Sequence, residues 1–233
     1  MKKILTTILV TIFSSLLSQN CETLIPEIYI SDKAKVIYET KLAEAKLNFS
    51  KDPSADNLIW LGRRTAYLGN YEDAIEIYSK GIDQFPKDAR FYRHRGHRYI
   101  SSRCFDLAIK DLKKATRLTR GKPNKIEPDG LPNALGIPTS TLQGNIYYHL
   151  GLTYYIQGKY HKARYVYEKC LNVAKNPDSY VAAANWLYVI YRHLGKDKKA
   201  TNLLNSINDD MSLIENHSDR KSTRLNSSHT SIS

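Results

Sequence analysis

The chain has 233 residues, with 35 lysines and arginines against 23 aspartates and glutamates, a formal net charge of +12 at pH 7. This basic balance fits an anionic partner but is not extreme enough to require nucleic acid. The three cysteines, Cys21, Cys104 and Cys170, form no CxxC pair, which excludes the common zinc-ribbon class of metal protein.

The N-terminus reads as an export signal. Two lysines precede an uncharged apolar run over residues 4–17, which is too short for a membrane-spanning helix. We expect a signal peptide of residues 1–18 and therefore a periplasmic or cell-envelope protein. The alternative is a leader of residues 1–20 with a lipid anchor at Cys21, although residues 19 and 20 lack the small side chains that usually precede a lipidated cysteine. No later apolar run is long enough to span a bilayer.

The C-terminal letters look like translated DNA adapter. The sequence DRKSTRLNSSH, residues 219–229, corresponds codon by codon to a string that resembles a common sequencing-library adapter. We therefore exclude residues 219–233 from fold reasoning. The remaining residues, 21–218, carry 30 basic and 22 acidic side chains, a formal net charge of +8.

The first predicted element after the leader is a helix within residues 29–54. Ser31 can cap its start, and apolar residues recur at helical spacing along one face: Ile37, Tyr38, Leu42, Ala45 and Phe49. We expect this helix to cover the open end of whatever follows it.

A 34-residue period dominates the rest of the chain. The stretch LIWLGRRTAYLGNYEDAIEIYSKGIDQFP, residues 58–86, superposes on later segments when it is shifted by that period. Small residues recur at its fixed places: Gly62, Gly96 and Gly151 early in the period, and Ala74, Ala108 and Ala163 later in it. This pattern of small, aromatic and proline positions resembles the tetratricopeptide repeat family.

The resemblance implies an all-α superhelix of about four helical hairpins, with the N-terminal helix packed on the first. The predicted array covers residues 55–214, and its repeats are 55–88, 89–122, 144–177 and 181–214. The small residues let paired helices approach closely, and Cys170 falls where a buried thiol is expected.

Residues 123–143 interrupt the array with a proline-rich insertion. Because it also contains apolar residues, we expect it to pack down and to close or shape a binding site. The chain is similar to exported bacterial tetratricopeptide proteins that share RHRGHRYI, residues 93–100, and an EPDG…PN…IPTSTL insertion. That similarity implies no particular activity.

The RHRGHRYI stretch falls on the helix that lines the concave groove in this family. The positions that face the groove in family members correspond here to Trp60, Arg63, Arg90, Arg93, His94, His97, Tyr148, His149 and Trp186. Arginine grips carboxylates in a two-pronged manner, and histidine would add charge below about pH 6.5. The predicted partner is an acidic peptide or a carboxylate-bearing molecule. Some family members clamp a terminal carboxylate at these places, but the usual lysine and asparagine are missing.

Arg95 occupies a seam position that holds leucine in the other repeats, so it needs a carboxylate partner. Four acids are candidates: Asp106, Asp111, Glu127 and Asp129. Pairing with either of the last two would pin the insertion onto the array.

Two other functional classes stay open. His94, His97 and His149 could hold a metal in a metal-dependent enzyme, although neighbouring arginines oppose a cation. A structural scaffold that uses its outer face is the second. The sequence contains no G-x-S-x-G, H-E-x-x-H or Cys–His signature, so we expect no enzyme and no cofactor. We expect no nucleic-acid partner, because of the export signal and because the basic residues should gather in one groove.

Overall fold

The computed structural model describes residues 28–208 and 210–218, and every regular element in those ranges is a helix. Their bounds are α1 (Asp32–Lys51), α2 (Ala55–Tyr67), α3 (Tyr71–Gln84), α4 (Ala89–Ser101), α5 (Phe105–Thr119), α6 (Leu142–Ile156), α7 (Tyr160–Val173), α8 (Pro177–His193) and α9 (Asp197–Asn205). None of these helices is both long and apolar enough to cross a lipid bilayer.

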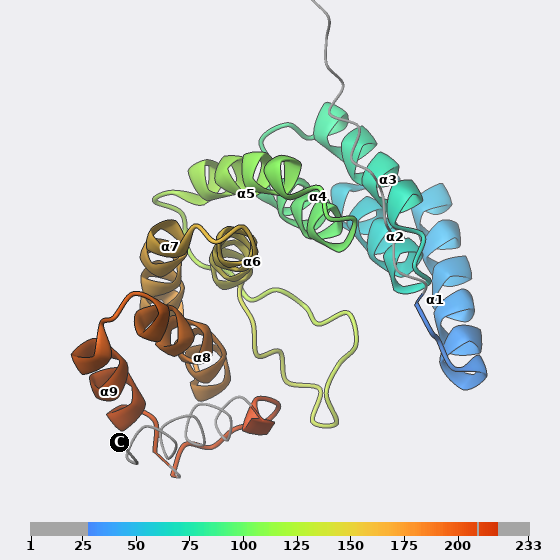
Figure 1. Ribbon diagram of the computed structural model, residues 1–233. Helices are drawn as coiled ribbons and strands as arrows, with labels where there is room; N and C mark the ends of the chain where they lie inside the picture. Colours follow the sequence, from blue (N-terminus) through green and yellow to red (C-terminus); the bar gives the residue numbers. More distant parts are fainter. Residues whose placement is uncertain (1–27, 209, 219–233) are drawn as a thin grey trace, which may run out of the picture.

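The helices form a single arch of stacked hairpins (Figure 1). Each helix packs on the next along the chain, from α1 against α2 at one end to α8 against α9 at the other. The first helices of successive hairpins, α2, α4, α6 and α8, also contact one another in sequence. This stacking buries three neighbouring clusters of apolar side chains, which one hairpin could not build alone. The predicted all-α superhelix is confirmed.

Small residues set the spacing within each hairpin. A Cβ atom at Gly62 would overlap the ring of Tyr78, and one at Gly151 would overlap the ring of Tyr167. An aromatic ring on the second helix therefore fills the space that the missing side chain leaves on the first. Cys170 is buried as expected, and burial raises the pKa of its thiol to about 12.

The N-terminal helix covers the first hairpin with only part of its predicted face. Ser31 Oγ accepts a hydrogen bond from the Ala34 amide, as expected for a cap. Tyr38 lies 6.0 Å from Tyr67 between ring centroids, and Phe49 packs on the core of the first hairpin. Ile37 is exposed, so its predicted place in the packed face is wrong.

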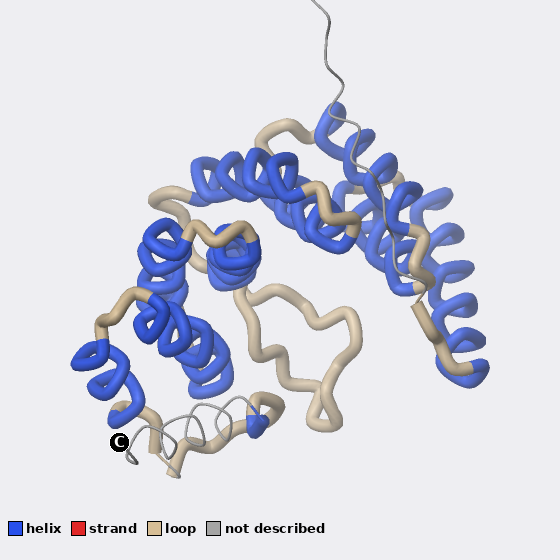
Figure 2. Tube along the Cα trace, viewed as in Figure 1, coloured by secondary structure: helices blue, strands red, loops and turns tan. Residues whose placement is uncertain are grey.

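The insertion is the longest loop in the described ranges, and it projects into the hollow of the arch (Figures 1 and 2). Backbone hydrogen bonds from Glu127 to Ser140 and from Leu142 to Lys125 draw its two ends together. Four of its apolar side chains are exposed: Ile126, Leu131, Leu135 and Ile137. The expectation that apolar packing holds the insertion down is therefore wrong, and polar contacts hold it instead.

Candidate functional site

Three arginines of the array hold the EPDG segment of the insertion, residues 127–130. The Arg93 guanidinium on α4 lies 3.0 Å from the Glu127 carboxylate, and both side chains are buried. Arg63 and Arg64 on α2 each donate a hydrogen bond of 2.8 Å to backbone carbonyl oxygens of the segment. The insertion is thus pinned to the concave side by a buried ion pair and by charge-assisted hydrogen bonds.

Glycine is needed at one point of this contact. A Cβ atom at Gly130 would collide with the hydroxyl of Tyr67 and crowd the guanidinium of Arg63. The backbone of the insertion therefore approaches α2 as closely as a residue without a side chain permits.

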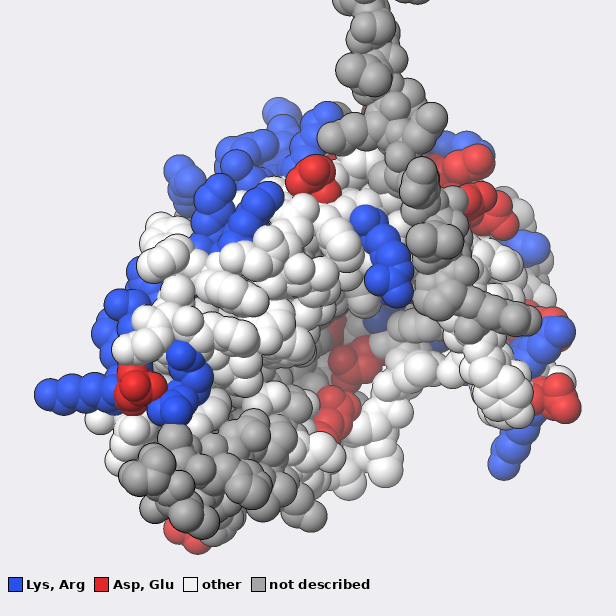
Figure 3. Space-filling view, viewed as in Figure 1, with Lys and Arg blue, Asp and Glu red and all other residues white. Residues whose placement is uncertain are grey.

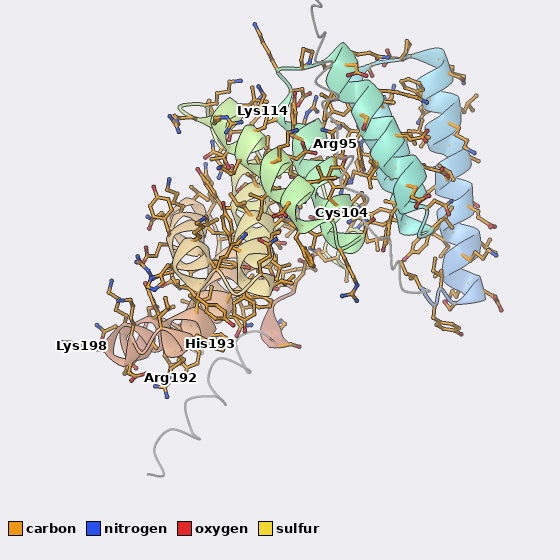
Figure 4. All side chains as sticks on the ribbon, turned by 45° about the horizontal axis from the view of Figure 1, so that its top comes forward. Arg95, Cys104, Lys114, Arg192, His193 and Lys198 are labelled. Atoms are coloured by element: carbon orange, nitrogen blue, oxygen red, sulfur yellow. The ribbon has the colours of Figure 1, made fainter. Side chains whose placement is uncertain are left out.

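Arg95 does not pin the insertion, which corrects one of the sequence-based alternatives. Its guanidinium donates to both carboxylate oxygens of Asp111 on α5, at 2.7 and 3.0 Å, and to Ser79 Oγ at 2.9 Å. Figure 4 shows Arg95 within the packing of the hairpins. An ion pair therefore occupies the position between the helices that leucine fills in the other repeats. Arg93, and not Arg95, forms the ion pair with the insertion.

His94 lies between the Arg93–Glu127 ion pair and the buried ring of Tyr78. Its Nδ1 is 3.0 Å from Arg93 Nη1, and because arginine only donates, Nδ1 accepts and the proton sits on Nε2. The ring stacks on Tyr78 with 5.5 Å between centroids. Burial, followed by the charge of Arg93, lowers the pKa of His94 well below its usual value. The imidazole is therefore neutral at physiological pH.

His97 and His149 lie against each other with 4.0 Å between ring centroids. His149 Nδ1 donates a hydrogen bond of 2.7 Å to the Asn145 carbonyl. Burial lowers the pKa of His149 to about 3, and burial followed by the neighbouring His149 lowers the pKa of His97. The expectation that these histidines gain charge just below pH 6.5 is wrong, because desolvation keeps them neutral.

The three histidines do not form a metal centre. His94 uses one ring nitrogen on Arg93, and His149 uses one on a backbone carbonyl. Across the described part of the chain, no group of three or more His, Cys, Asp or Glu side chains is arranged to hold a metal ion. The geometry therefore gives no support to the metal-dependent alternative.

The two predicted groove tryptophans, Trp60 on α2 and Trp186 on α8, lie far apart along the array. Trp60 stacks under Arg63 and Arg64, whose guanidinium carbons lie 4.4 and 4.7 Å from its ring centroid. At the far side, Trp186 Nε1 donates a hydrogen bond of 2.8 Å to the Tyr148 hydroxyl. The two tryptophans are thus at opposite ends of the set.

Arg90 is committed to ion pairs and is not free for a ligand. Its guanidinium pairs with Asp88 at 2.6 Å and also with Asp56 of the preceding hairpin. These carboxylates raise its pKa further above the ordinary value. Arg90 therefore links two repeats.

A small cavity, called the arginine cavity below, lies beside the docked insertion. It measures about 100 Å³ and is lined by Arg63, Ala66, Tyr67, Tyr78, Arg93, His94, His97 and Arg98. Among the described residues, no carboxylate forms an ion pair with Arg98, and burial lowers its pKa. Arg93 Nε is buried and makes no hydrogen bond to any residue in the described ranges. Three guanidinium groups and no described carboxylate line the cavity, and two carboxylates lie near it: Glu127, paired with Arg93, and Asp129, whose charge interacts with Arg63. The cavity could therefore accept one further oxyanion.

Arg98 belongs to the charged RHRGHRYI stretch but not to the predicted groove set. The groove positions of the family correspond to His94 and His97 on this helix and not to Arg98. Arg98 lines the arginine cavity, and Tyr71 lies against it, with the guanidinium carbon 5.1 Å from the ring centroid. Its i+4 spacing from His94 was the one available signal.

Tyr148 and His149 line a second cavity, of about 210 Å³, between the base of the insertion, α6 and α8. Its walls carry no charged side chain, since His149 is neutral. Asn216 closes one side, held by Asp178, whose carboxylate accepts from the Asn216 amide at 2.9 Å. The predicted groove set is therefore divided between a basic cavity and a neutral one.

The expectation that the basic residues gather in one groove is also wrong. Lys and Arg side chains crowd the outer rim of the arch over α5, α7 and α9, whereas acidic side chains appear in its hollow (Figure 3). Lys114 and Lys198 extend outward from the array in Figure 4.

Comparisons with known proteins agree with this geometry. A sequence model of the tetratricopeptide repeat family matches residues 144–177. The structure resembles crystal structures of MamA (TM-score 0.55, 19% identity, covering 87% of this chain and 99% of that one) and of TTC0263, a thermophilic TPR protein from Thermus thermophilus (0.55, 16%, 86% and 94%). It also resembles YrrB, described as a TPR protein with an unusual peptide-binding site (0.54, 14%, 79% and 84%). No curated protein matches the sequence.

The chain therefore has the fold of tetratricopeptide-repeat proteins, and one of its repeats, residues 144–177, matches the sequence model of that family. Proteins with this fold mediate protein–protein interaction and are generally non-enzymatic scaffolds.

Proposed function

We propose that this chain is an exported, non-enzymatic interaction module that binds an anionic peptide, or another carboxylate-bearing ligand, in its concave groove. The main support for this proposal is the positive charge of the three arginines that line the arginine cavity. Arg98 is half-buried there, and no carboxylate among the described residues forms an ion pair with it. A partly desolvated charge without a partner is unfavourable, so an incoming carboxylate would gain from it.

The size of the cavity indicates how the ligand enters. About 100 Å³ admits a carboxylate group but no folded element. The ligand therefore reaches Arg98 and the free Nε of Arg93 with one acidic side chain or with its terminal carboxylate, as guanidinium groups favour. The rest of an extended peptide would lie along the insertion, where Leu131, Leu135 and Ile137 are exposed. The likeness to YrrB supports a peptide as the ligand class.

The insertion has a defined part in this proposal. Its Glu127 already satisfies one arginine of the cavity, and its backbone projects into the hollow with four exposed apolar side chains. It thereby shapes the site and limits the room for a ligand. Export rests on the basic start and the apolar run over residues 4–17, with cleavage after residue 18 proposed over a lipid anchor at Cys21.

A labelled peptide made only of Asp, Glu, Gly and Ser tests the groove. Fluorescence anisotropy would measure its binding to the whole chain and to two variants, Arg98→Gln and the matched control Lys198→Gln on the outer face. We expect Arg98→Gln to weaken binding about tenfold, because a charge-assisted contact is lost, and Lys198→Gln to change it less than about twofold. No binding, or an equal loss in both variants, would contradict the groove proposal.

A further inference from the structure

We propose a second, independent binding site on the outer face of the arch. It takes an acidic segment of a partner protein that inserts one large apolar side chain. The site is a cavity between α5, α6 and α7, called the lysine cavity below. It shares no residue with the arginine cavity and does not depend on the concave groove.

The lysine cavity is larger than the arginine cavity and is apolar inside. It measures about 370 Å³, within the usual range of ligand pockets of about 300–1,000 Å³. Its walls are Tyr147, Leu150, Tyr154, Tyr165 and Val166, and its rim carries Lys113, Thr116, His161, Lys162 and Lys169. Tyr165 is 56% exposed, which leaves a large aromatic face open to a partner.

The rim has no internal counter-charge. The three helices that form it contain only three carboxylates, and each is engaged elsewhere. Asp111 pairs with Arg95, Glu168 pairs with Arg164 at 2.7 Å, and Asp106 accepts from the Gln157 amide at 3.1 Å. None of the three lines the cavity. The rim lysines therefore remain available to an acid from another molecule.

Aromatic rings hold the lysines at the rim. Lys169 Nζ lies 4.4 Å from the ring centroid of Tyr165, and Lys162 Nζ lies 5.9 Å from that of Tyr154. Such cation–π contacts position ammonium groups without neutralising them. Their charge is thus directed at the mouth of an apolar cavity.

This combination selects the kind of occupant. A recessed apolar cavity receives a protruding side chain such as Leu or Phe, and a ring of lysines favours carboxylates on either side of it. A lipid surface is a poorer match, because it binds apolar groups that protrude from the protein. Nucleic acid stacks its bases on open aromatic faces, but here Lys169 lies over the exposed ring of Tyr165, and Tyr154 is only 8% exposed. An acidic peptide with one apolar anchor fits both features.

The test uses two labelled peptides that differ at one position. Both are rich in Asp and Glu, and one carries a central Phe where the other has Ser. Anisotropy is measured with the whole chain, with Lys162→Glu/Lys169→Glu, and with the matched double variant Lys110→Glu/Lys198→Glu, which reverses two exposed lysines outside the cavity.

We expect the Phe peptide to bind about tenfold more tightly than the Ser peptide, as burial of one aromatic side chain predicts. Lys162→Glu/Lys169→Glu should remove most of that difference, Lys110→Glu/Lys198→Glu should keep it, and Arg98→Gln should leave it unchanged. Equal losses in both double variants, or no preference for Phe, would reduce the site to general charge attraction and overturn the proposal. So would tighter binding of single-stranded RNA or of anionic lipid vesicles, with the same dependence on Lys162 and Lys169. Loss of the Phe preference in Arg98→Gln alone would place the contact in the groove.

Discussion

On the concave face, Arg93 is buried against Glu127, and Arg63 and Arg64 donate to the backbone of the same insertion. On the convex face, the lysines around Tyr165 lie on the surface, with no carboxylate lining their cavity. The two faces use the same kind of charge for different purposes. In the groove, positive charge holds the chain's own insertion, and outside it stays available to other molecules.

This difference shows why net charge alone does not locate a binding site. A cation that is already paired has its charge compensated, so a partner gains little by approaching it, whereas removal of its buried carboxylate is destabilising. Within the groove, Arg98 is the exception, because it is half-buried and no carboxylate among the described residues forms an ion pair with it. The comparison therefore predicts large stability effects on the concave side and small ones on the convex side.

The largest expected effect is that of Glu127→Ala. It leaves Arg93 buried without its carboxylate, which typically costs about 4 kcal/mol of unfolding free energy. Urea denaturation followed by circular dichroism measures the change.

The control for Glu127→Ala is Asp197→Ala, which breaks the exposed pair with Arg192, where the two side chains are 65% and 38% exposed. Exposed pairs contribute about 0–1 kcal/mol. If both variants lost the same small amount, the Arg93–Glu127 pair would not anchor the insertion.

The next effect is a loss of stability in mild acid. Burial lowers the folded-state pKa of His149 to about 3, while the unfolded chain titrates near 6.5. The stability that depends on neutral His149 is therefore complete above about pH 6.5 and is lost as the pH falls toward 3. Linkage gives about 2 kcal/mol lost between pH 7 and pH 5 from this histidine.

His149→Gln provides the comparison for the acid effect, since glutamine does not titrate. Urea midpoints at pH 7, 6 and 5 should fall more steeply in the wild type than in the variant. Parallel pH profiles would show that His149 is protonated in the folded protein. His94 and His97, whose pKa values are also lowered by burial, should keep part of the slope in the variant.

The repeat architecture could be predicted from sequence because its cause is local and periodic. Gly62 and Gly151 are small since aromatic rings on the partner helices occupy the space beside them. That requirement recurs with each hairpin, so the letters repeat with the period. Arg95 also stood out, because leucine fills its place in the other repeats.

The pairing across the insertion could not be predicted in the same way. Arg93 and Arg95 are both on α4, and the candidate acids outnumber them, so spacing alone cannot assign partners. The backbone course of the insertion decides that Glu127 meets Arg93. The protonation of the histidines depends on how deeply the folded chain buries them, and the sequence alone does not give that depth.

A smaller effect on stability is expected from Gly130→Ala. This variant disturbs the close contact between the insertion and α2 without removing any charge. The added Cβ would collide with the Tyr67 hydroxyl, so the segment must move and weaken its hydrogen bonds to Arg63 and Arg64. We expect a loss of about 1 kcal/mol and faster cleavage of the insertion by a protease. Leu135→Ala is the matched control, because that side chain is already exposed. Equal cleavage rates would mean that the segment does not rest on α2.

The smallest effect is expected on the convex face. Lys162→Ala and Lys169→Ala remove ammonium groups that contact aromatic rings and no carboxylate, so each should change the unfolding free energy by less than about 0.5 kcal/mol. Tyr165→Ser should behave similarly, since its ring is largely exposed. Urea denaturation of the three variants beside Glu127→Ala measures the contrast directly. A loss near that of Glu127→Ala would mean that the lysine cavity serves the fold. Stability near the wild-type value, together with loss of binding to the Phe peptide, would show that the convex charges are kept for a partner.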